Sequence, residues 1–278
     1  MRILNNYLTY NGISTTSYRI RVSGEHTFGS PERDETTVSI PGRNGDVVLD
    51  NGRWKNRTIE FDCSIAKDFY GNFEAFRQEI IAAHGYHRLE STYHPEEYYI
   101  ARLVGTIEPE MNVALNVGSF SLTFDRKPQR FLKRGEIPVG GEGEDSVTLN
   151  NPTPYIARPL LRCWTNGPAD DTLYLSYKPE YAGNPYVIHY QALTSILSDA
   201  LSAEDYAAAV AAGLYVDIDC ETGECYGVYQ SDGEDVVINL NSVFALTPDG
   251  ELPYLRPGVT DWVTTLDGFQ VIPRWFTL

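Results

Sequence analysis

The feature that most constrains the fold is a strict alternation of apolar and polar residues in short stretches of the chain. Between residues 59 and 65 every second residue is apolar, and residues 18–23 repeat this pattern. Side chains along a strand point alternately to its two faces, so both stretches predict half-buried β-strands. The chain has 23 glycines, 16 prolines and 19 tyrosines but only 2 methionines, which suits short strands joined by tight turns. The sequence predicts a mainly β protein.

A two-stranded arm is expected between these stretches. Two pairs, Asn44-Gly45 and Asn51-Gly52, supply the positive-φ positions that tight hairpin turns require. We expect a hairpin or a long arm over residues 35–57. Its expected members are Val38, Ile40, Pro41, Gly42, Arg43, Asn44, Gly45, Val47, Leu49, Asn51, Gly52 and Trp54.

One helix is expected in the first half of the chain. Apolar residues recur at three- and four-residue spacing, and Gly85 follows as a stop; they are Phe69, Phe73, Phe76 and Ile80. Two long strands should follow, over residues 98–108 and 113–124. In the second strand the apolar alternation changes phase at Gly118-Ser119, which favours a β-bulge there.

The composition changes between residues 134 and 146, which contain glycine, proline and glutamate but little to bury. Residues 1–133 carry 16 Lys+Arg against 17 Asp+Glu, and residues 134–278 carry 6 against 21, so the net charges are −1 and −15. We therefore expect a first domain over residues 1–133, a linker over 134–146 and a second domain over 147–278. The acidic half disfavours nucleic acid and anionic membranes as partners, although simple solubility would explain the charge equally well.

The second half predicts a β-sandwich, because short apolar runs alternate with turn signals such as residues 221–224 and 231–235. One helix should interrupt it, with Ser202 and Asp205 as a capping pair and Gly213 as its stop.

The N-terminal residues 1–22 contain no apolar core of a signal peptide, and no apolar run reaches the 18 residues of a membrane span. We therefore expect a cytoplasmic site of synthesis and no insertion into membranes. The four cysteines are too few and too scattered for a disulfide scaffold, so free buried thiols are expected. They are Cys63, Cys163, Cys220 and Cys225.

Two groups of side chains are candidate metal ligands, and neither is favoured. The first group is His84, His87 and His94. Gly85 ends the helix before His87, so His84 and His87 are not held at helical spacing. In the second, the order of Asp217, Asp219 and Glu221 with Gly223 departs from that of a calcium loop and is typical of a strand and its turn. We expect neither a metal nor another cofactor.

Catalytic motifs are also missing from the sequence. No GxSxG or HExxH motif and no recognisable Cys/His pairing occurs, and residues 140–143 lack the lysine of a phosphate-binding loop. We expect no enzyme.

Four stretches together resemble a known family: IPGRNGDVVLDNGRWKNRTIEFDCSI, NPTPYIARPLLRCW, DIDCETGEC and LRPGVTDWVTTLDGFQVIPRWFTL. The chain is similar over nearly its whole length to the distal tail proteins of siphophages and prophages, chiefly of Gram-positive hosts. The most specific match is residues 40–45 with the alternating strand that follows. The alanine-rich helix near Ser202 is not part of the resemblance.

This resemblance implies a first domain related to tail tube proteins, a β-sandwich with one helix and an extended hairpin. Six copies would close into a ring, with a galectin-like β-sandwich as the second domain outside it. The implied role is a structural hub at the virion tail tip, assembled in the host cytoplasm. The implied partners are the tail tube protein, the tail-associated tip protein and the tape measure protein, with receptor-binding proteins as further candidates.

A carbohydrate-binding module for cell-wall glycans is the alternative, since exposed aromatic rings of a sandwich can stack on sugars. The candidate contacts are Trp164, Tyr174, Tyr177, Tyr181 and Tyr186, with Trp262 as a further aromatic of the same half. We expect most of these rings to face the core instead.

Overall fold

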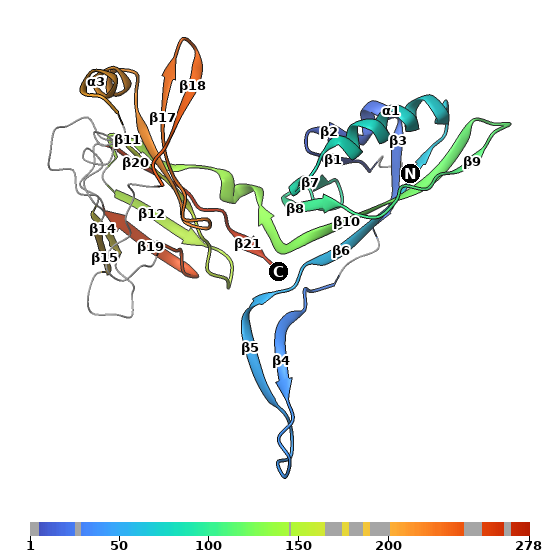
Figure 1. The fold of residues 1–278 in the computed structure, drawn as a ribbon, viewed down its shortest axis with the longest axis horizontal. Helices are drawn as coiled ribbons and strands as arrows, with labels where there is room; N and C mark the ends of the chain where they lie inside the picture. Colours follow the sequence, from blue (N-terminus) through green and yellow to red (C-terminus); the bar gives the residue numbers. More distant parts are fainter. Residues whose placement is uncertain are drawn as a thin grey trace. The chain divides into compact units, whose positions relative to one another are not determined.

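The computed structural model describes residues 6–25, 29–144, 146–164, 174–177, 186–189, 201–241, 252–263 and 268–278. The chain divides into two compact units, Met1–Phe131 together with Leu278, and Leu132–Thr277. Strands dominate both units, as the sequence predicts (Figure 1).

The first unit is built on a sheet in which the strands follow the order β2-β1-β7-β8-β10-β6-β3, and β9 adds to β10. The sheet curls, because a bridge between Asn6, just ahead of β1, and Val22 of β3 joins its two sides. The expected sandwich thus takes the form of one curled sheet around a single core. Its strands are β1 (Leu8–Tyr10), β2 (Ile13–Ser14), β3 (Ile20–Glu25), β6 (Arg57–Ile65), β7 (His87–Ser91), β8 (Glu97–Leu103), β9 (Glu110–Asn112) and β10 (Val117–Leu132). A short 3-10 helix, η1 (Thr15–Tyr18), joins β2 to β3.

Helix α1 (Phe69–Ala82) closes the core of this unit, and its four predicted apolar residues are all buried. Phe73 packs on Phe120 of β10 with ring centroids 5.0 Å apart, and Phe69 stacks on Phe73 at 5.1 Å. Each fully buried aromatic side chain contributes about 1.5–3 kcal/mol through the hydrophobic effect. Aromatic packing therefore fixes the helix on the sheet.

The N-terminus of α1 is capped from a distance. Asp68 precedes the helix but makes no side-chain cap hydrogen bond. Instead, the backbone amides of Phe69 and Tyr70 donate to the carbonyl oxygen of Asn116 at 3.0 Å and to its Oδ1 at 3.3 Å. Asn116 lies in the turn between β9 and β10 with a φ of 49°, which asparagine tolerates better than most residues. The helix and the β9–β10 hairpin are thus joined directly.

The expected bulge at Gly118-Ser119 is wrong. Strand β10 pairs with β6 in unbroken register from Gly118, opposite Ile65, to Arg126, opposite Arg57. The phase changes because residues 113–116 form a turn rather than a strand. Gly118 is needed for close packing, since a Cβ there would lie 2.6 Å from the carbonyl oxygen of Glu110 and 2.7 Å from the Phe69 ring.

The arm consists of β4 (Arg33–Val38) and β5 (Val47–Trp54), a two-stranded sheet of its own in the first unit. It leads directly into β6 (Figure 1).

Two sheets enclose one core in the second unit, as expected for a β-sandwich. One has the order β11-β20-β13-β16-β17-β18 and the other β12-β19-β14-β15. Leu149 and Trp262 of the second sheet belong to the same buried cluster as Leu161, Ile218 and Phe269 of the first. The strands are β11 (Val139–Glu142), β12 (Ser146–Asn151), β13 (Leu160–Trp164), β14 (Tyr174–Tyr177), β15 (Tyr186–His189), β16 (Tyr215–Asp219), β17 (Cys225–Ser231), β18 (Glu234–Asn239), β19 (Gly258–Val263) and β20 (Gly268–Ile272). The short strand β21 (Phe276–Thr277) belongs to neither of these two sheets.

Residues 134–146, which we expected to form a flexible linker, contain regular secondary structure instead. Residues 133–136 form the 3-10 helix η2 (Lys133–Glu136), and β11 pairs with β20 inside the second unit. A Cβ at Gly140 would lie only 2.2 Å from the carbonyl oxygen of Phe269, so this glycine permits two backbones to approach. Gly140, which suggested a flexible linker, therefore serves close strand packing.

The alanine-rich helix α3 (Ala203–Ala211) forms as predicted. The Ser202 hydroxyl accepts a hydrogen bond from the backbone amide of Asp205 at 3.2 Å, and Gly213 follows the helix with a φ of 79°. Ala209 and Leu214 enter the core of the second unit.

All four cysteines are free and buried, which confirms that prediction. Burial raises the pKa of Cys63 and of Cys225 to about 12, and it raises the pKa of Cys163 and Cys220 as well. The thiols are therefore protonated at neutral pH and shielded from reagents.

The folded protein should consume almost no thiol reagent at pH 8, because the reactive species is the thiolate. After unfolding in denaturant, all four thiols should react, as followed by the absorbance of the released aromatic thiol. Rapid reaction of even one thiol in the native protein would contradict this burial.

Replacing Asn116 by alanine should destabilise the protein by about 1 kcal/mol, since one cap acceptor of α1 is lost and alanine tolerates positive φ poorly. Asn116→Asp is the matched control, because it keeps an acceptor at the helix N-terminus and adds a favourable charge there. The measurement is the midpoint of urea unfolding. Equal midpoints for the alanine and aspartate variants would show that the cap contributes nothing.

Candidate functional site

The β4–β5 arm is the candidate site, because it is a folded element without a core of its own. Within the described residues its two strands pair only with each other, so both outer edges carry unpaired backbone groups. The register runs from Arg33, opposite Trp54, to Val38, opposite Val47. An isolated two-stranded sheet is marginally stable in water, and open edges readily accept another strand. The arm is therefore suited to binding another protein surface.

The tip of the arm turns at Pro41-Gly42, ahead of the Asn44-Gly45 pair. The Arg43 amide donates to the carbonyl oxygen of Ile40 at 3.1 Å, and Gly42 has a φ of 83°. Proline followed by a positive-φ glycine is the signature of a type II turn. Gly45 also has a positive φ, 79°, as expected from its sequence.

The second Asn-Gly pair makes no turn, contrary to its interpretation from the sequence. Asn51-Gly52 lies within β5, where the register against β4 shifts between Arg33 and Glu35. Gly52 has a φ of 74°, and its amide donates to Asp50 Oδ1 at 2.8 Å. The positive φ was predicted, but it serves a bulge in the strand rather than a hairpin turn.

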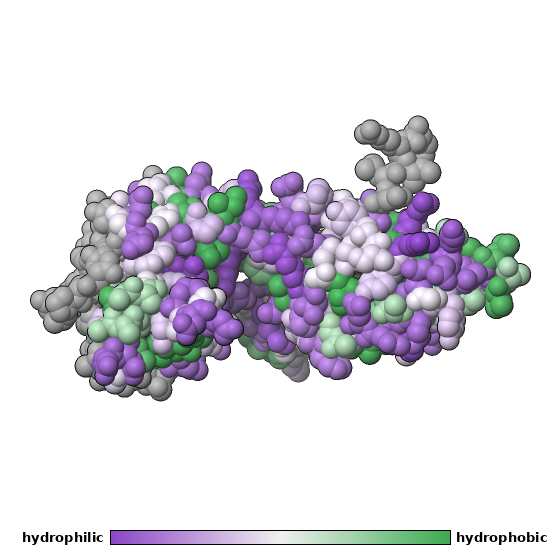
Figure 2. All heavy atoms as spheres, turned by 90° about the horizontal axis from the view of Figure 1, so that it is seen from above, coloured by the Kyte–Doolittle hydropathy of each residue, from purple (hydrophilic) through white to green (hydrophobic). Residues whose placement is uncertain are grey.

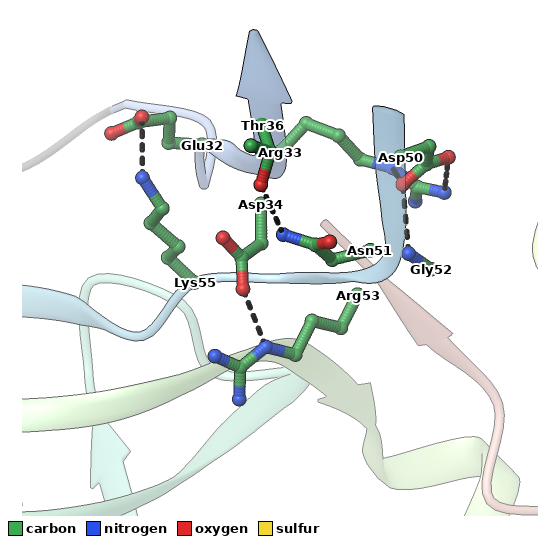
Figure 3. Close-up of polar contacts among 9 residues, drawn as sticks. All are labelled: Glu32, Arg33, Asp34, Thr36, Asp50, Asn51, Gly52, Arg53 and Lys55. Atoms are coloured by element: carbon green, nitrogen blue, oxygen red, sulfur yellow. Dashed lines mark hydrogen bonds and ion pairs between the residues drawn. The ribbon is translucent and has the colours of Figure 1, made fainter. Parts of the chain in front are cut away.

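Three ion pairs join the two strands at the base of the arm (Figure 3). Arg33 binds both carboxylate oxygens of Asp50, with Nε 2.9 Å from Oδ1. Arg53 Nε lies 2.6 Å from Asp34 Oδ2. Next to this pair, Lys55 Nζ lies 2.8 Å from Glu32 Oε1. Because each pair links β4 or its flank to β5 or its flank, the base is held in one register.

Further contacts strengthen the base. The guanidinium of Arg33 lies 5.0 Å from the centre of the Trp54 ring, which is a cation–π contact on a half-buried indole. The Asn51 side-chain amide donates to the Thr36 hydroxyl at 3.4 Å (Figure 3). Trp54 thus belongs to the base and not to the exposed part of the arm.

The ion pairs shift the titration of the acids that take part. The hydrogen bond from Arg33 lowers the pKa of Asp50, and the hydrogen bond from Arg53 lowers the pKa of Asp34. The hydrogen bond to Glu32 raises the pKa of Lys55. Asp34, Asp50 and Lys55 are therefore charged at neutral pH.

Beyond the base, one face of the arm is apolar. Thr36 lies opposite Leu49, and Val38 lies opposite Val47, so these four side chains share a face. Val38 is 42% exposed and Leu49 is 53% exposed. Ile40, two residues beyond Val38, is 43% exposed. Thr37 and Val48 lie on the opposite face of the arm.

The glycan-contact candidates are only partly described. Trp164 is half-buried on β13 and packs on Tyr215 with ring centroids 6.0 Å apart. Tyr174 and Tyr177 lie on β14, and Tyr186 lies on β15, but the orientations of their side chains fall outside the described residues, as does Tyr181. Trp262 is 2% exposed and cannot stack on a sugar. Glycan contact therefore stays a prediction.

The residues considered as metal ligands have structural partners. The His87 ring nitrogen Nε2 lies 2.7 Å from the carbonyl oxygen of His84. Asp219 Oδ1 accepts hydrogen bonds from the backbone amides of Glu221 and Thr222, as the expected strand and turn require. Among the described residues, no group of three His, Cys, Asp or Glu side chains is placed to hold a metal ion. The helices in that part of the chain include none that is long and apolar enough to cross a membrane.

A second exposed apolar element was not predicted from the sequence. Val113 and Leu115, expected in a strand, lie in the turn between β9 and β10 and are 79% and 69% exposed. The flanking asparagines Asn112 and Asn116 are the available signal, because asparagine favours turns.

Lowering the pH should loosen the base of the arm. The ionised forms of Asp34 and Asp50 stabilise the folded arm above their ordinary pKa of 3.8, and this stabilisation is lost as the pH falls through their lowered folded-state values. A variant with Asp34→Asn and Asp50→Asn should therefore show faster amide hydrogen exchange in β4 and β5 at pH 7. The pairs are exposed, so the change should be modest.

The control for this exchange experiment is Glu35→Gln, which removes a charge from β4 but leaves the three ion pairs of the base intact. Exchange in β6 should be unchanged in all three proteins. Equal exchange in the double variant and in the control would show that the ion pairs do not hold the arm.

Comparisons with known proteins agree with this architecture. Residues 11–125 match the family model of the phage tail protein RIFT-related domain. No curated protein sequence matches the chain significantly. The distal tail protein Dit of phage SPP1, described as a paradigm of the hub adsorption apparatus in phages infecting Gram-positive bacteria, has a similar structure. It is 13% identical with a TM-score of 0.58, over 96% of this chain and 97% of that one.

Chains of the phage p2 baseplate in its activated conformation are similar as well. The calcium form is 10% identical with a TM-score of 0.51, over 96% of this chain and 97% of the other. The strontium form gives the same identity and TM-score, with 96% of each chain covered. This family model and this fold are those of structural phage tail proteins, and they confirm the resemblance seen in the sequence. Residues 11–125 therefore match the phage tail protein RIFT-related domain, and the chain as a whole has a fold similar to that of a siphophage distal tail protein.

Proposed function

We propose that this chain is the structural hub of a phage tail, in which six copies form a ring between the distal end of the tail tube and the tip or baseplate proteins. The observation that carries this proposal is the β4–β5 arm, which is held in register at its base but exposes an apolar face and two open strand edges. The number six comes from the resemblance to distal tail proteins.

The arm supports self-association because its exposed face has nothing to cover it among the described residues. Val38, Ile40 and Leu49 are each more than 40% exposed. Covering such side chains yields about 25 cal/mol per Å² of apolar surface removed from water. An arm that reaches a neighbouring copy makes a contact between two different surfaces, and such contacts form a closed ring when the rotation between copies closes.

The charge distribution supports an outer position for the second unit. Residues 134–278 carry a net charge of −15, and six such copies close to a common axis would repel one another. In this proposal the first unit continues the lumen of the tail tube, and the galectin-like second unit lies outside the ring.

The comparisons support the choice of partners. The SPP1 relative is a hub, and the p2 relatives are parts of a baseplate. By analogy, the tail tube protein, the tape measure protein and the tail-associated tip protein would contact the ring of this chain at the virion tail tip. Receptor-binding proteins would attach through the second unit. Assembly would take place in the host cytoplasm before lysis.

Light scattering on the full chain tests the role of the arm. The wild-type protein should have the mass of six copies, and the variant Val38→Asp with Leu49→Asp should be monomeric, because the charges prevent burial of the apolar face. Thr37→Asp with Val48→Asp is the matched control on the opposite face, since Val48 is 54% exposed and Leu49 is 53% exposed.

The control variant should keep the mass of the wild-type ring. Rings that survive the change at Val38 and Leu49 would contradict the assignment of the arm. A stable assembly with a number of copies other than six would contradict the proposed ring while leaving the arm contact intact.

A further inference from the structure

The turn between β9 and β10 presents a second apolar surface, separate from the arm. Val113 and Leu115 are 79% and 69% exposed, and Met111 beside them is 37% exposed. In Figure 2 the hydrophobic colour gathers at the end of the molecule where Figure 1 places the β9–β10 hairpin. We call Met111, Val113 and Leu115 the hairpin tip.

Hydrogen bonds and close packing hold the hairpin tip in place. The Leu115 amide donates to Asn112 Oδ1 at 3.2 Å inside the turn. Asn116 accepts hydrogen bonds from the first two amides of α1, and Gly118 packs closely against Phe69. A tip held in this way loses little conformational entropy on binding, which favours docking.

A hollow of about 550 Å³ lies at the other end of α1 and could receive such a tip. Apolar side chains of Ile81, Leu103 and Ile107 line it, and Ile81 is 47% exposed. Arg77 and Arg102 also line it. The volume far exceeds the roughly 30 Å³ that one water molecule occupies in the liquid, so it accommodates aliphatic side chains.

The tip cannot reach the hollow of its own chain. The Val104 amide, next to Leu103 of the hollow, donates to the carbonyl oxygen of Thr123, whereas β10 leaves the turn at Val117. Val117 and Thr123 are six residues apart along the extended strand β10, so the turn lies about 20 Å from the hollow. Only another molecule can therefore bring the two surfaces together.

Charge complementarity between the hairpin tip and the hollow indicates which molecule brings the two surfaces together. Glu110 is exposed beside the tip, and Arg77 and Arg102 at the hollow have side chains that are 42% and 52% exposed. Arg77 already binds Glu74, and Arg102 binds Asp125 through Nε at 2.9 Å. A guanidinium has five N–H donors, so each arginine retains donors for a further carboxylate.

We propose that the hairpin tip of one copy of this chain inserts into the hollow at the C-terminal end of α1 in a second copy, with Glu110 placed against Arg77 and Arg102. This contact joins two different surfaces, so it propagates from copy to copy around a ring. It deepens the proposed hub function and rests on the self-association proposed there, but it uses residues separate from the arm.

Site-directed cross-linking tests the contact in the full chain. A Leu115→Cys variant is mixed with a Thr106→Cys variant, because Thr106 lines the hollow. Mild oxidation should give cross-linked dimers in the mixture, and a chain with both changes should give a ladder of higher oligomers. The native cysteines are at most 1% exposed and do not compete.

Either single variant alone provides the control and should stay uncross-linked under the same oxidation. No dimer in the mixture, or equal dimer formation by Leu115→Cys alone, would overturn the proposal. The second result would mean that two tips face each other.

Weakened association gives an independent measure. Leu115→Ser should raise the dissociation constant of self-association about tenfold or more, since a buried leucine side chain is lost from the contact. Val237→Ser, which changes a 60% exposed valine of the second unit, should leave it unchanged. Unaltered association of the Leu115 variant would contradict the proposal.

The two proposals fail separately. The cross-link between positions 115 and 106 reports on the hairpin contact, and the mass of the Val38 and Leu49 variant reports on the arm. Cross-linking that persists when this arm variant has lost the ring would support the hairpin contact alone.

Discussion

The long ladder between β6 and β10 is the feature on which the first unit depends. It runs in unbroken register from Arg57 opposite Arg126 to Ile65 opposite Gly118. The arm continues from the Arg57 end through β5, and the β9–β10 hairpin continues from the Gly118 end. The ladder spans about 27 Å, so it sets the separation of the two projecting elements. Helix α1 packs on the ladder through Phe69, Phe73 and Phe76, whose rings contact that of Phe120 in β10.

The arm and the β9–β10 hairpin are held in position by different interactions. The arm is fixed by charge at its base, where three ion pairs bridge the strands, and it is apolar on one face further out. The hairpin is fixed by hydrogen bonds to α1 and is apolar only at its turn. In both, polar contacts made within the chain determine the position of apolar side chains that stay exposed in the described part of it. Such a division suits an element that must be ordered before its partner arrives.

The sequence predicts the parts of this fold that depend on local patterns. Helix α1 was predicted because Phe69, Phe73, Phe76 and Ile80 repeat at helical spacing, and β6 was predicted from its alternation. The Ser202 cap of α3 was recognised for the same reason. These patterns act over a few residues, so they are readable without knowledge of the tertiary contacts.

The errors concern glycines and turns whose role depends on distant residues. Gly118 was interpreted as a bulge, but it makes room for Phe69, and Gly140 was interpreted as part of a linker, but it makes room for Phe269. Asn51-Gly52 has the expected backbone conformation in a bulge instead of a turn. For the candidate site, the residues of the arm were identified from the sequence. The ion pairs at its base and the hairpin tip were not, because both depend on pairing between segments.

The apolar face of the arm has a thermodynamic consequence for an assembly that uses it. Burial of Val38, Ile40 and Leu49 in a contact would lower the heat capacity of the system, because apolar surface is removed from water. The hydrophobic contribution to such a contact weakens on cooling. A ring closed through this face would therefore be held less firmly in the cold than at growth temperature, while the charged base of each arm would keep its register at both.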